Sequence, residues 1–240
     1  EALQGAQEIA EKSGGNVSAI TFSSSAGEKL TGYDLSEILV IENPQLENYN
    51  PLDYVKAMED VVTSESPDIL IFGHSYEARD WVPRLSARLD IPFISDCIGF
   101  KNDGEFTLVR SVYQGKFNAD VCANSDKCIV SFQSGAFRID GLKTGSASIR
   151  NVSVDLSCVS TSIQPGEKFQ ESDTSVDLTQ ADIIVSVGRG IGKEENMPLA
   201  KELAATLKGE LASSRPVVDS GWLESYHQVG SSGQTVSPKL

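Results

Sequence analysis

Apolar runs separated by amphipathic stretches predict an alternation of strands and helices along this chain. Residues 69–73 and 183–187 are continuous, mostly apolar runs with the length of strands buried inside a parallel sheet. After each run, apolar residues recur at helical spacing. This pattern predicts an α/β fold. The length of 240 residues suits one large domain or two smaller ones, and the polar stretch described below favours two domains, each a mainly parallel sheet flanked by helices.

The other expected elements follow from the same periodicities and from turn residues. Further strands are expected at residues 17–22, 37–41, 93–95, 106–113, 119–122, 128–132 and 209–212. Helices are expected at residues 1–12, 51–64, 79–89 and 196–208, the first with Leu3, Ala6, Ile9 and Ala10 on one face. Residues 23–27 are expected to form a loop, and residues 138–149, rich in glycine and serine, a mobile one. The polar stretch 164–178 is interpreted as a linker between an amino-terminal domain, residues 1–163, and a second domain, residues 179–240.

A glycine-rich turn follows the apolar run at 183–187. Gly188-Arg189-Gly190 matches the first half of the GxGxxG phosphate-binding pattern, but the third glycine, Gly192, comes one residue too early. A buried strand, a glycine-rich turn and a helix in this order present backbone N–H groups to a phosphate, and the arginine adds a positive charge. An ordinary strand-to-helix turn is the alternative at this point.

The charge of the chain bears on its choice of partners. Lys and Arg number 20 and Asp and Glu 34 among the 240 residues, which gives a net charge of −14. Such a surface repels nucleic acid and anionic membranes, and it suits a positively charged patch on a partner protein. No apolar run has the length of a membrane span.

Candidate reactive side chains are few. The four cysteines, at positions 97, 122, 128 and 158, form no CxxC pair, so buried thiols are expected rather than a metal site. His74 follows the apolar run at 69–73. It is interpreted as hydrogen-bonded structure, with catalysis the lesser alternative, because no second histidine or carboxylate has a spacing that completes a catalytic triad.

Two later segments carry a more specific pattern. Residues 214–222 read Ser-Arg-Pro-Val-Val-Asp-x-Gly-Trp, and residues 228–238 read Gln-Val-Gly-x-Ser-Gly-x-Thr-Val-x-Pro. Together with Gly-Arg-Gly at 188–190, they closely resemble the FAD-binding domain of the electron-transfer flavoprotein alpha subunit. Residues 75–89 and the hairpin pattern Arg-x-x-Tyr-x-Gly-Lys at 110–116 resemble the amino-terminal domain of the same family. The resemblance therefore covers nearly the whole chain.

The resemblance implies a set of FAD-binding residues. Arg189 would lie near the flavin ring or the diphosphate, and Ser214 and Arg215 would reach the ring system. Residues 229–232 would wrap the cofactor with backbone and hydroxyl donors, although the family often has Gln-Thr where Ser231 and Ser232 stand. The implied set consists of Arg189, Gly190, Ser214, Arg215, Gln228, Val229, Gly230, Ser231 and Ser232.

Arg79, Arg84 and Arg88 stand at helical spacing. Arg88 is interpreted as part of a solvated face paired with acidic neighbours. The resemblance favours a partner-facing or cofactor-facing role for Arg79.

The resemblance also implies a function and partners. The chain would be the alpha subunit of a heterodimer with a beta subunit, an electron carrier rather than a stand-alone enzyme, without catalytic residues or a metal. It would pass electrons from flavin dehydrogenases or NADH to a quinone reductase or another acceptor, possibly with electron bifurcation. It would be cytoplasmic in a bacterium or archaeon, or lie in the mitochondrial matrix of a eukaryote.

Two alternatives come from other classes of protein. An NAD-dependent Rossmann-fold oxidoreductase is disfavoured because GxGxxG is not matched and no acidic residue stands at the ribose distance. A nucleotide-binding signalling module without a redox role is the other. In this family the first domain normally has a strand before Glu1, and the second continues past Leu240. The cofactor site and the second sheet are therefore expected to be incomplete in these residues.

Overall fold

The computed structural model describes residues 1–102, 104–113, 115–159, 162–166, 177–230 and 232–240. The chain divides into two compact units, Glu1–Glu167 and Lys168–Leu240, and each is described here by itself. The division falls within the predicted linker 164–178, most of which lies outside the described residues. The exact domain limits 1–163 and 179–240 stay a prediction.

The described residues of the first unit form two sheets. The smaller one is parallel, in the order β1-β2-β8, and consists of β1 (Ser18–Thr21), β2 (Glu37–Val40) and β8 (Ile149–Asn151). The larger one has the order β3-β7-β4-β5-β6, with β3 (Ile69–Gly73), β7 (Cys128–Phe132) and β4 (Phe93–Asn102) parallel, and β5 (Phe106–Val112) and β6 (Phe117–Val121) added as antiparallel strands. The predicted α/β class is confirmed, with an antiparallel extension on the larger sheet.

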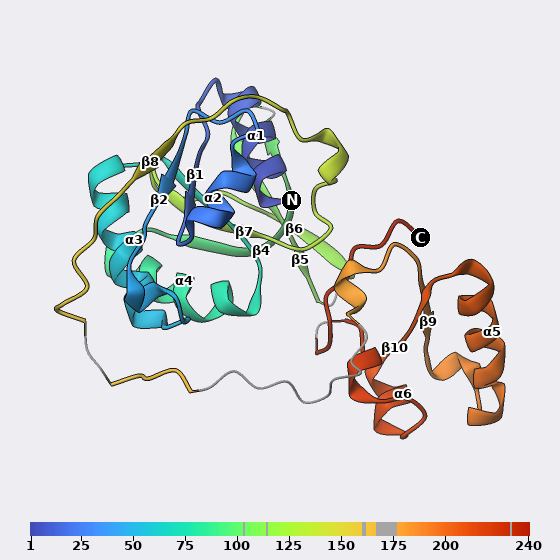
Figure 1. Ribbon diagram of the computed structural model, residues 1–240. Helices are drawn as coiled ribbons and strands as arrows, with labels where there is room; N and C mark the ends of the chain where they lie inside the picture. The colour runs from blue at the N-terminus through green and yellow to red at the C-terminus, as the bar shows by residue number, and fades with distance from the viewer. Residues whose placement is uncertain (103, 114, 160–161, 167–176, 231) are drawn as a thin grey trace. The chain divides into compact units, whose positions relative to one another are not determined.

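The α-helices that the structure describes in this unit cover these sheets: α1 (Ala2–Ser13), α2 (Ser24–Leu30), α3 (Pro51–Glu65) and α4 (Tyr76–Leu89) (Figure 1). Neighbouring residues of β7 point to opposite faces of the sheet. Ile129 packs in a cluster with side chains of α3 and α4, whereas Val130 packs in a cluster with Ile9 of α1. The central strands of the larger sheet are therefore buried on both faces, as their continuous apolar runs predict.

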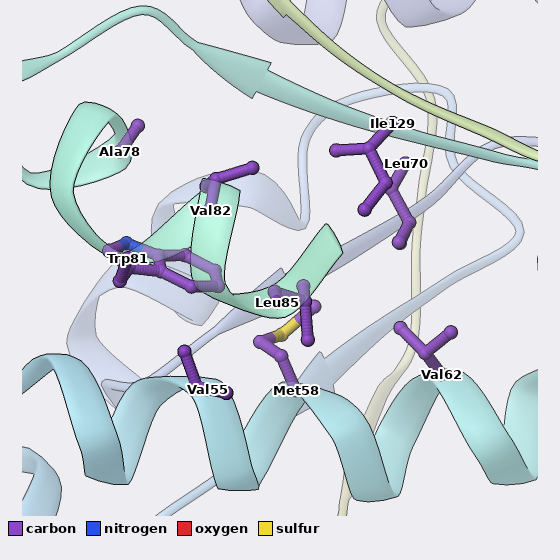
Figure 2. Packing of buried hydrophobic residues seen from close by; sticks show 9 residues of the cluster. All are labelled: Val55, Met58, Val62, Leu70, Ala78, Trp81, Val82, Leu85 and Ile129. Carbon is purple, nitrogen blue, oxygen red and sulfur yellow. The ribbon is translucent and has the colours of Figure 1, made fainter. Parts of the chain in front are cut away.

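The core beneath α4 is built from two amphipathic helices facing each other. Figure 2 shows Val55 and Met58 of α3 pointing toward Trp81 and Leu85 of α4. Leu85 is fully buried, and removing such a side chain from water stabilises a fold by about 1.5–3 kcal/mol. This packing holds the middle of α4 against α3.

Several expected boundaries were wrong. Residues 23–27 are not a loop, since α2 begins at Ser24. Gly27 lets this short helix lie on β2, because a Cβ added there would meet Val40 Cγ2 at 2.8 Å. The helix expected from residue 79 begins at Tyr76, because the Ser75 hydroxyl accepts a hydrogen bond from the Ala78 N–H at 3.1 Å.

The strand expected at residues 93–95 is longer, and a strand of the smaller sheet was missed. β4 runs for 10 residues because it pairs with β5 along its second half. The segment 138–149, expected to be mobile, bridges Tyr33 through Thr144, and its last residue begins β8. The residues of β8 are all exposed and form a strand through their pairing with β2. The hydrophobic periodicity of the sequence therefore does not predict this strand.

The buried face of α1 also differs from expectation. Ile9 is buried as predicted, but Leu3, Ala6 and Ala10 are only half-buried, whereas Gln7 is buried. The Gln7 amide donates to the backbone oxygens of Asp34 and Lys143 at 3.0 and 3.2 Å, and it accepts from the Lys143 N–H at 3.0 Å. These bonds offset the cost of burying the amide.

The cysteines fit the expectation of buried thiols only in part. All four are free, and Cys97 and Cys128 are buried. Burial raises the pKa of the Cys97 thiol to about 12, so this thiol stays protonated at neutral pH. Cys122 and Cys158 are exposed, contrary to the expectation.

The second unit is built around two parallel strands in its described residues, β9 (Ile184–Val187) and β10 (Glu210–Ser213). α5 (Met197–Leu207) connects them, and α6 (Arg215–Asp219) follows β10 (Figure 1). The core consists of Val187, Met197, Ala200 and Val217. The expected order of strand, glycine-rich turn, helix and strand is confirmed. Across the described residues of both units, no helix combines the length and apolar character that crossing a membrane requires.

Candidate functional site

Three chain segments meet at the carboxyl edge of β9 and β10. The two strands end side by side, because Val187 pairs with Ser213 in the parallel register. Residues 188–192 follow β9, and Ser214 follows β10. A third segment, which begins at Gln228, joins them through a bridge between Ser213 and Gln228 and a bond from the Val229 N–H to the Ser213 oxygen at 2.9 Å. In open α/β sheets, this edge is where ligands bind.

The turn after β9 leaves open space beside its backbone. Arg189–Ile191 forms a 3₁₀ turn that ends at Gly192, whose φ of 87° favours glycine. A Cβ added to Gly190 would meet nothing within 4 Å, so the chain itself does not need a glycine there. Arg189 is exposed and forms no ion pair with a described residue. The turn therefore offers a cation and free approach to the backbone.

The second segment brings a hydroxyl and a guanidinium to the same edge. The Ser214 N–H donates to the Val187 oxygen at 2.9 Å, and a Cβ on Gly188 would lie 3.8 Å from the Ser214 hydroxyl. Arg215 opens α6, and its Nε lies 3.4 Å from an Asp219 carboxylate oxygen. Both side chains of this pair are more than 60% exposed, so the pairing holds the guanidinium only weakly.

The third segment closes into a compact loop held by Gln228. The buried amide of Gln228 donates to the Ser232 backbone oxygen at 2.7 Å and to the Ser232 hydroxyl at 3.0 Å. The backbone N–H of Gln234 donates to the backbone oxygen of Gln228 at 2.7 Å, and Gly230 has a φ of 114°. The side chain of Gln228 therefore shapes the loop. Val229 is half-buried and Gly230 exposed, whereas Ser231 lies outside the described residues.

Ser213 is a site residue that sequence reasoning missed. It is fully buried at the end of β10, and its hydroxyl has no hydrogen-bond partner among the described residues. An unpaired buried hydroxyl is costly, which suggests a partner supplied by a ligand. Its position next to Ser214, at the end of an apolar strand, is the signal that was available in the sequence.

These features fit a ligand that carries phosphate groups. Two glycines, Gly190 and Gly230, have open space where a Cβ would lie, and Arg189 and Arg215 supply cations for a diphosphate or a ring anion. The hydroxyls of Ser213 and Ser214 supply donors at the strand ends. Such a donor set binds and orients a cofactor and contains no nucleophile with an adjacent base.

Comparison with known proteins places both units in one family. Residues 1–157 match the family described as the electron transfer flavoprotein domain, and residues 177–240 match the electron transfer flavoprotein FAD-binding domain. The chain is 32% identical to the electron transfer flavoprotein subunit alpha of Thermoanaerobacterium thermosaccharolyticum, over 100% of this chain and 75% of that protein. The chain belongs to the electron transfer flavoprotein alpha subunit family.

Two further relatives agree with this assignment. The electron transfer flavoprotein subunit alpha of Bacillus subtilis is 31% identical over 90% of this chain and 66% of its own length. The acryloyl-CoA reductase electron transfer subunit beta of Anaerotignum propionicum is 30% identical over 89% of this chain and 67% of its own length. This electron transfer flavoprotein alpha chain binds FAD, and its family implies a beta subunit as partner. All three segments described above lie within the residues that match the FAD-binding domain.

In the first unit of this electron transfer flavoprotein chain, the fold gives His74 partners that the sequence spacing did not reveal. The Ser131 hydroxyl accepts from the Asp96 N–H at 3.2 Å and lies 2.9 Å from Nδ1 of His74. Nε2 of His74 faces an Asp96 carboxylate oxygen at 3.5 Å. Ser131 is fully buried, so this group is a structural network and not a nucleophilic triad.

The arginines of α4 divide into two kinds. Arg84 pairs with Asp80 at 3.2 Å and Arg88 with Glu59 at 2.6 Å, as the interpretation of a solvated, paired face predicts for Arg88. Arg79 lies over the ring of Tyr76, 5.3 Å from its centroid, and it forms no ion pair with a described residue. Its charge therefore remains available to a partner.

Proposed function

We propose that this chain holds FAD at the carboxyl edge of β9 and β10 and, paired with a beta subunit, carries electrons from flavin dehydrogenases or NADH to a quinone reductase or a similar acceptor. The observation that carries the proposal is the convergence of the three segments at one strand edge, with open space beside two glycines. The match of residues 177–240 to the FAD-binding domain supports the identity of the ligand.

Bound FAD supplies the electron chemistry, and the chain's own residues bind and tune it. We assign phosphate or ring binding to Arg189, where Gly190 leaves the backbone free to approach. Ser214 and Arg215 act at the ring system. The loop at 228–232 encloses the cofactor, with Gln228 holding the loop in shape from within.

The donor and acceptor are proposed from the family's chemistry. The Anaerotignum propionicum relative is named as an electron transfer subunit of acryloyl-CoA reductase, and one from Acetobacterium woodii as a subunit of lactate dehydrogenase (NAD(+),ferredoxin). These names support a carrier that works in a complex with a dehydrogenase or reductase. The relatives are bacterial, which supports the proposal of a cytoplasmic protein. Electron bifurcation remains a prediction.

Visible absorbance of the purified pair tests the proposal. The chain is co-expressed with the beta subunit of its source, purified without added flavin, and scanned between 300 and 600 nm as roughly the flavin range. We expect a yellow heterodimer whose flavin bands bleach on anaerobic addition of an electron donor. A colourless protein that binds NAD would support the Rossmann-fold oxidoreductase. A colourless protein that binds a nucleotide other than NAD would support the signalling module.

A further inference from the structure

The first unit contains a cleft that the proposed electron transfer does not use. Its volume is about 980 Å³. β1 and β3 are edge strands of the two sheets, paired with β2 and β7 respectively, and residues at the carboxyl ends of both line the cleft. Small-molecule sites in α/β folds lie at such a point, where successive strands continue in opposite directions, and they commonly measure about 300–1,000 Å³.

The floor of the cleft is aromatic. Phe22 and Tyr54 have ring centroids 4.4 Å apart, Tyr54 and Trp81 5.9 Å apart, and Phe72 and Trp81 5.2 Å apart. All four rings line the cleft, and Trp81 is anchored from below by the core of α3 and α4 (Figure 2). The electron-rich faces of such rings attract cations.

The rim carries negative charge. Glu42, Glu47 and Glu77 line the cleft, and none of them pairs with a cation among the described residues. Burial, and after it the charge of Glu77, raise the pKa of the Tyr54 hydroxyl. The Ser24 hydroxyl donates to a Glu42 carboxylate oxygen, which fixes that side chain at the mouth.

The lining contains no positive charge. No lysine, arginine or histidine is among the described residues that form the cleft. A phosphate group would therefore meet three carboxylates without a cation to balance it, which disfavours nucleotides. A positively charged group would gain from both the carboxylates and the ring faces.

We propose that this cleft binds an organic cation, an alkylammonium or guanidinium group whose apolar chain rests on the aromatic floor. The cation comes either from a free small amine or from a lysine or arginine side chain of a partner protein, and the chemistry of recognition is the same. All the residues that line the cleft belong to the first unit and lie outside the residues that match the FAD-binding domain.

Agmatine, which carries both a guanidinium and an ammonium group, is the probe for this site. It is titrated by calorimetry into the full-length protein, alongside n-pentanol as an uncharged ligand of similar chain length. We expect saturable binding of agmatine and none of n-pentanol. The double variant Glu42→Gln/Glu77→Gln should bind agmatine at least tenfold more weakly. The control variant Glu194→Gln/Glu202→Gln removes the same charge from exposed positions of the second unit and should keep the wild-type affinity.

Trp81 provides an independent readout of location. The chain has two tryptophans, so emission from a Trp222→Phe variant reports Trp81 alone, and agmatine should change it with the affinity found by calorimetry. Equal weakening in both charge variants, tight binding of n-pentanol, or tighter binding of adenosine or AMP than of agmatine would overturn the proposal.

The titration is repeated on the heterodimer with the beta subunit to identify the source of the cation. Loss of agmatine binding there that is restored by separating the subunits identifies a partner side chain. Unchanged binding identifies a free amine.

Discussion

At the scale of single residues, Arg215 is the group best placed to tune the flavin. It opens α6 at the strand edge, and among the described residues its one ion pair, with Asp219, is exposed and weak. A guanidinium stays charged at working pH and favours electron-rich forms of a nearby ring. Arg215→Ala should therefore lower the flavin midpoint potential, by about 60 mV per electron if the interaction is worth a factor of ten.

Anaerobic potentiometry of the full-length heterodimer measures this shift. Asp219→Ala is the matched control, since it frees the guanidinium and should leave the potential equal or higher. An unchanged potential in Arg215→Ala would mean that the exposed pair with Asp219 is the whole role of this arginine.

The substitution Ser213→Ala should have opposite effects on the FAD-free protein and on FAD binding. Its buried hydroxyl has no partner among the described residues, so Ser213→Ala should raise the melting temperature of the FAD-free protein. If FAD completes the hydrogen bond, the same variant should bind FAD roughly two- to thirteenfold more weakly, as about 0.5–1.5 kcal/mol implies. Thermal unfolding and flavin titration check both parts. A lower melting temperature without FAD contradicts the expectation.

His74 should make stability depend on pH. Burial, together with the charges of Arg79 and Arg110, lowers the pKa of His74 below its ordinary value of 6.5, and the charge of Asp96 opposes this only in part. The unfolded chain therefore takes up the proton first as pH falls. The contribution of the neutral His74 side chain to the free energy of unfolding is fully present above about pH 6.5. It is lost progressively as the pH falls below that value towards the folded-state pKa of His74.

Urea unfolding between pH 8 and pH 5 measures this effect. The loss of unfolding free energy below pH 6.5 should be smaller in His74→Gln than in the wild type. Parallel profiles of the two proteins would show that the network of His74, Ser131 and Asp96 does not contribute.

At the scale of elements, α2 shows why some of the fold was not predictable. Its first four residues are two serines, an alanine and a glycine, which show no apolar periodicity, and Ser and Gly are weak helix formers. The helix forms because Gly27 allows close contact with β2, which is a property of the folded sheet. Continuous apolar runs such as β3 and β7 were predicted well, because burial on both faces requires them.

Gly27→Val tests this explanation. The Cβ alone would lie 2.8 Å from a methyl group of buried Val40, so the variant should lose about 1–3 kcal/mol of unfolding free energy. Gly32→Val is the control, because a Cβ there meets nothing within 4 Å. Chemical denaturation of the full chain compares them. Equal stability of the two variants would show that α2 does not depend on this contact.

At the scale of the whole molecule, the sequence motifs predicted the family and the cofactor more completely than the geometry of the site. Arg189, Gly190, Ser214 and Arg215 stand at the ends of two strands, which a pattern of strand and turn can place. The inward role of Gln228 and the unpaired hydroxyl of Ser213 depend on a bridge between segments far apart in sequence, which no local pattern encodes. The same holds for the cleft of the first unit, whose lining comes from four separate stretches of chain.

The FAD affinity of a Gly190→Val variant tests the location of the cofactor most directly. No atom lies within 4 Å of the added Cβ position, so the variant should fold with the wild-type melting temperature in the absence of FAD. Its side chain would occupy the space over the turn at 188–192, so the heterodimer should lose most of its FAD. Gly32→Val, an open position in the first unit, should keep it. Full retention of FAD in Gly190→Val, at wild-type affinity, would contradict a site at the carboxyl edge of β9 and β10.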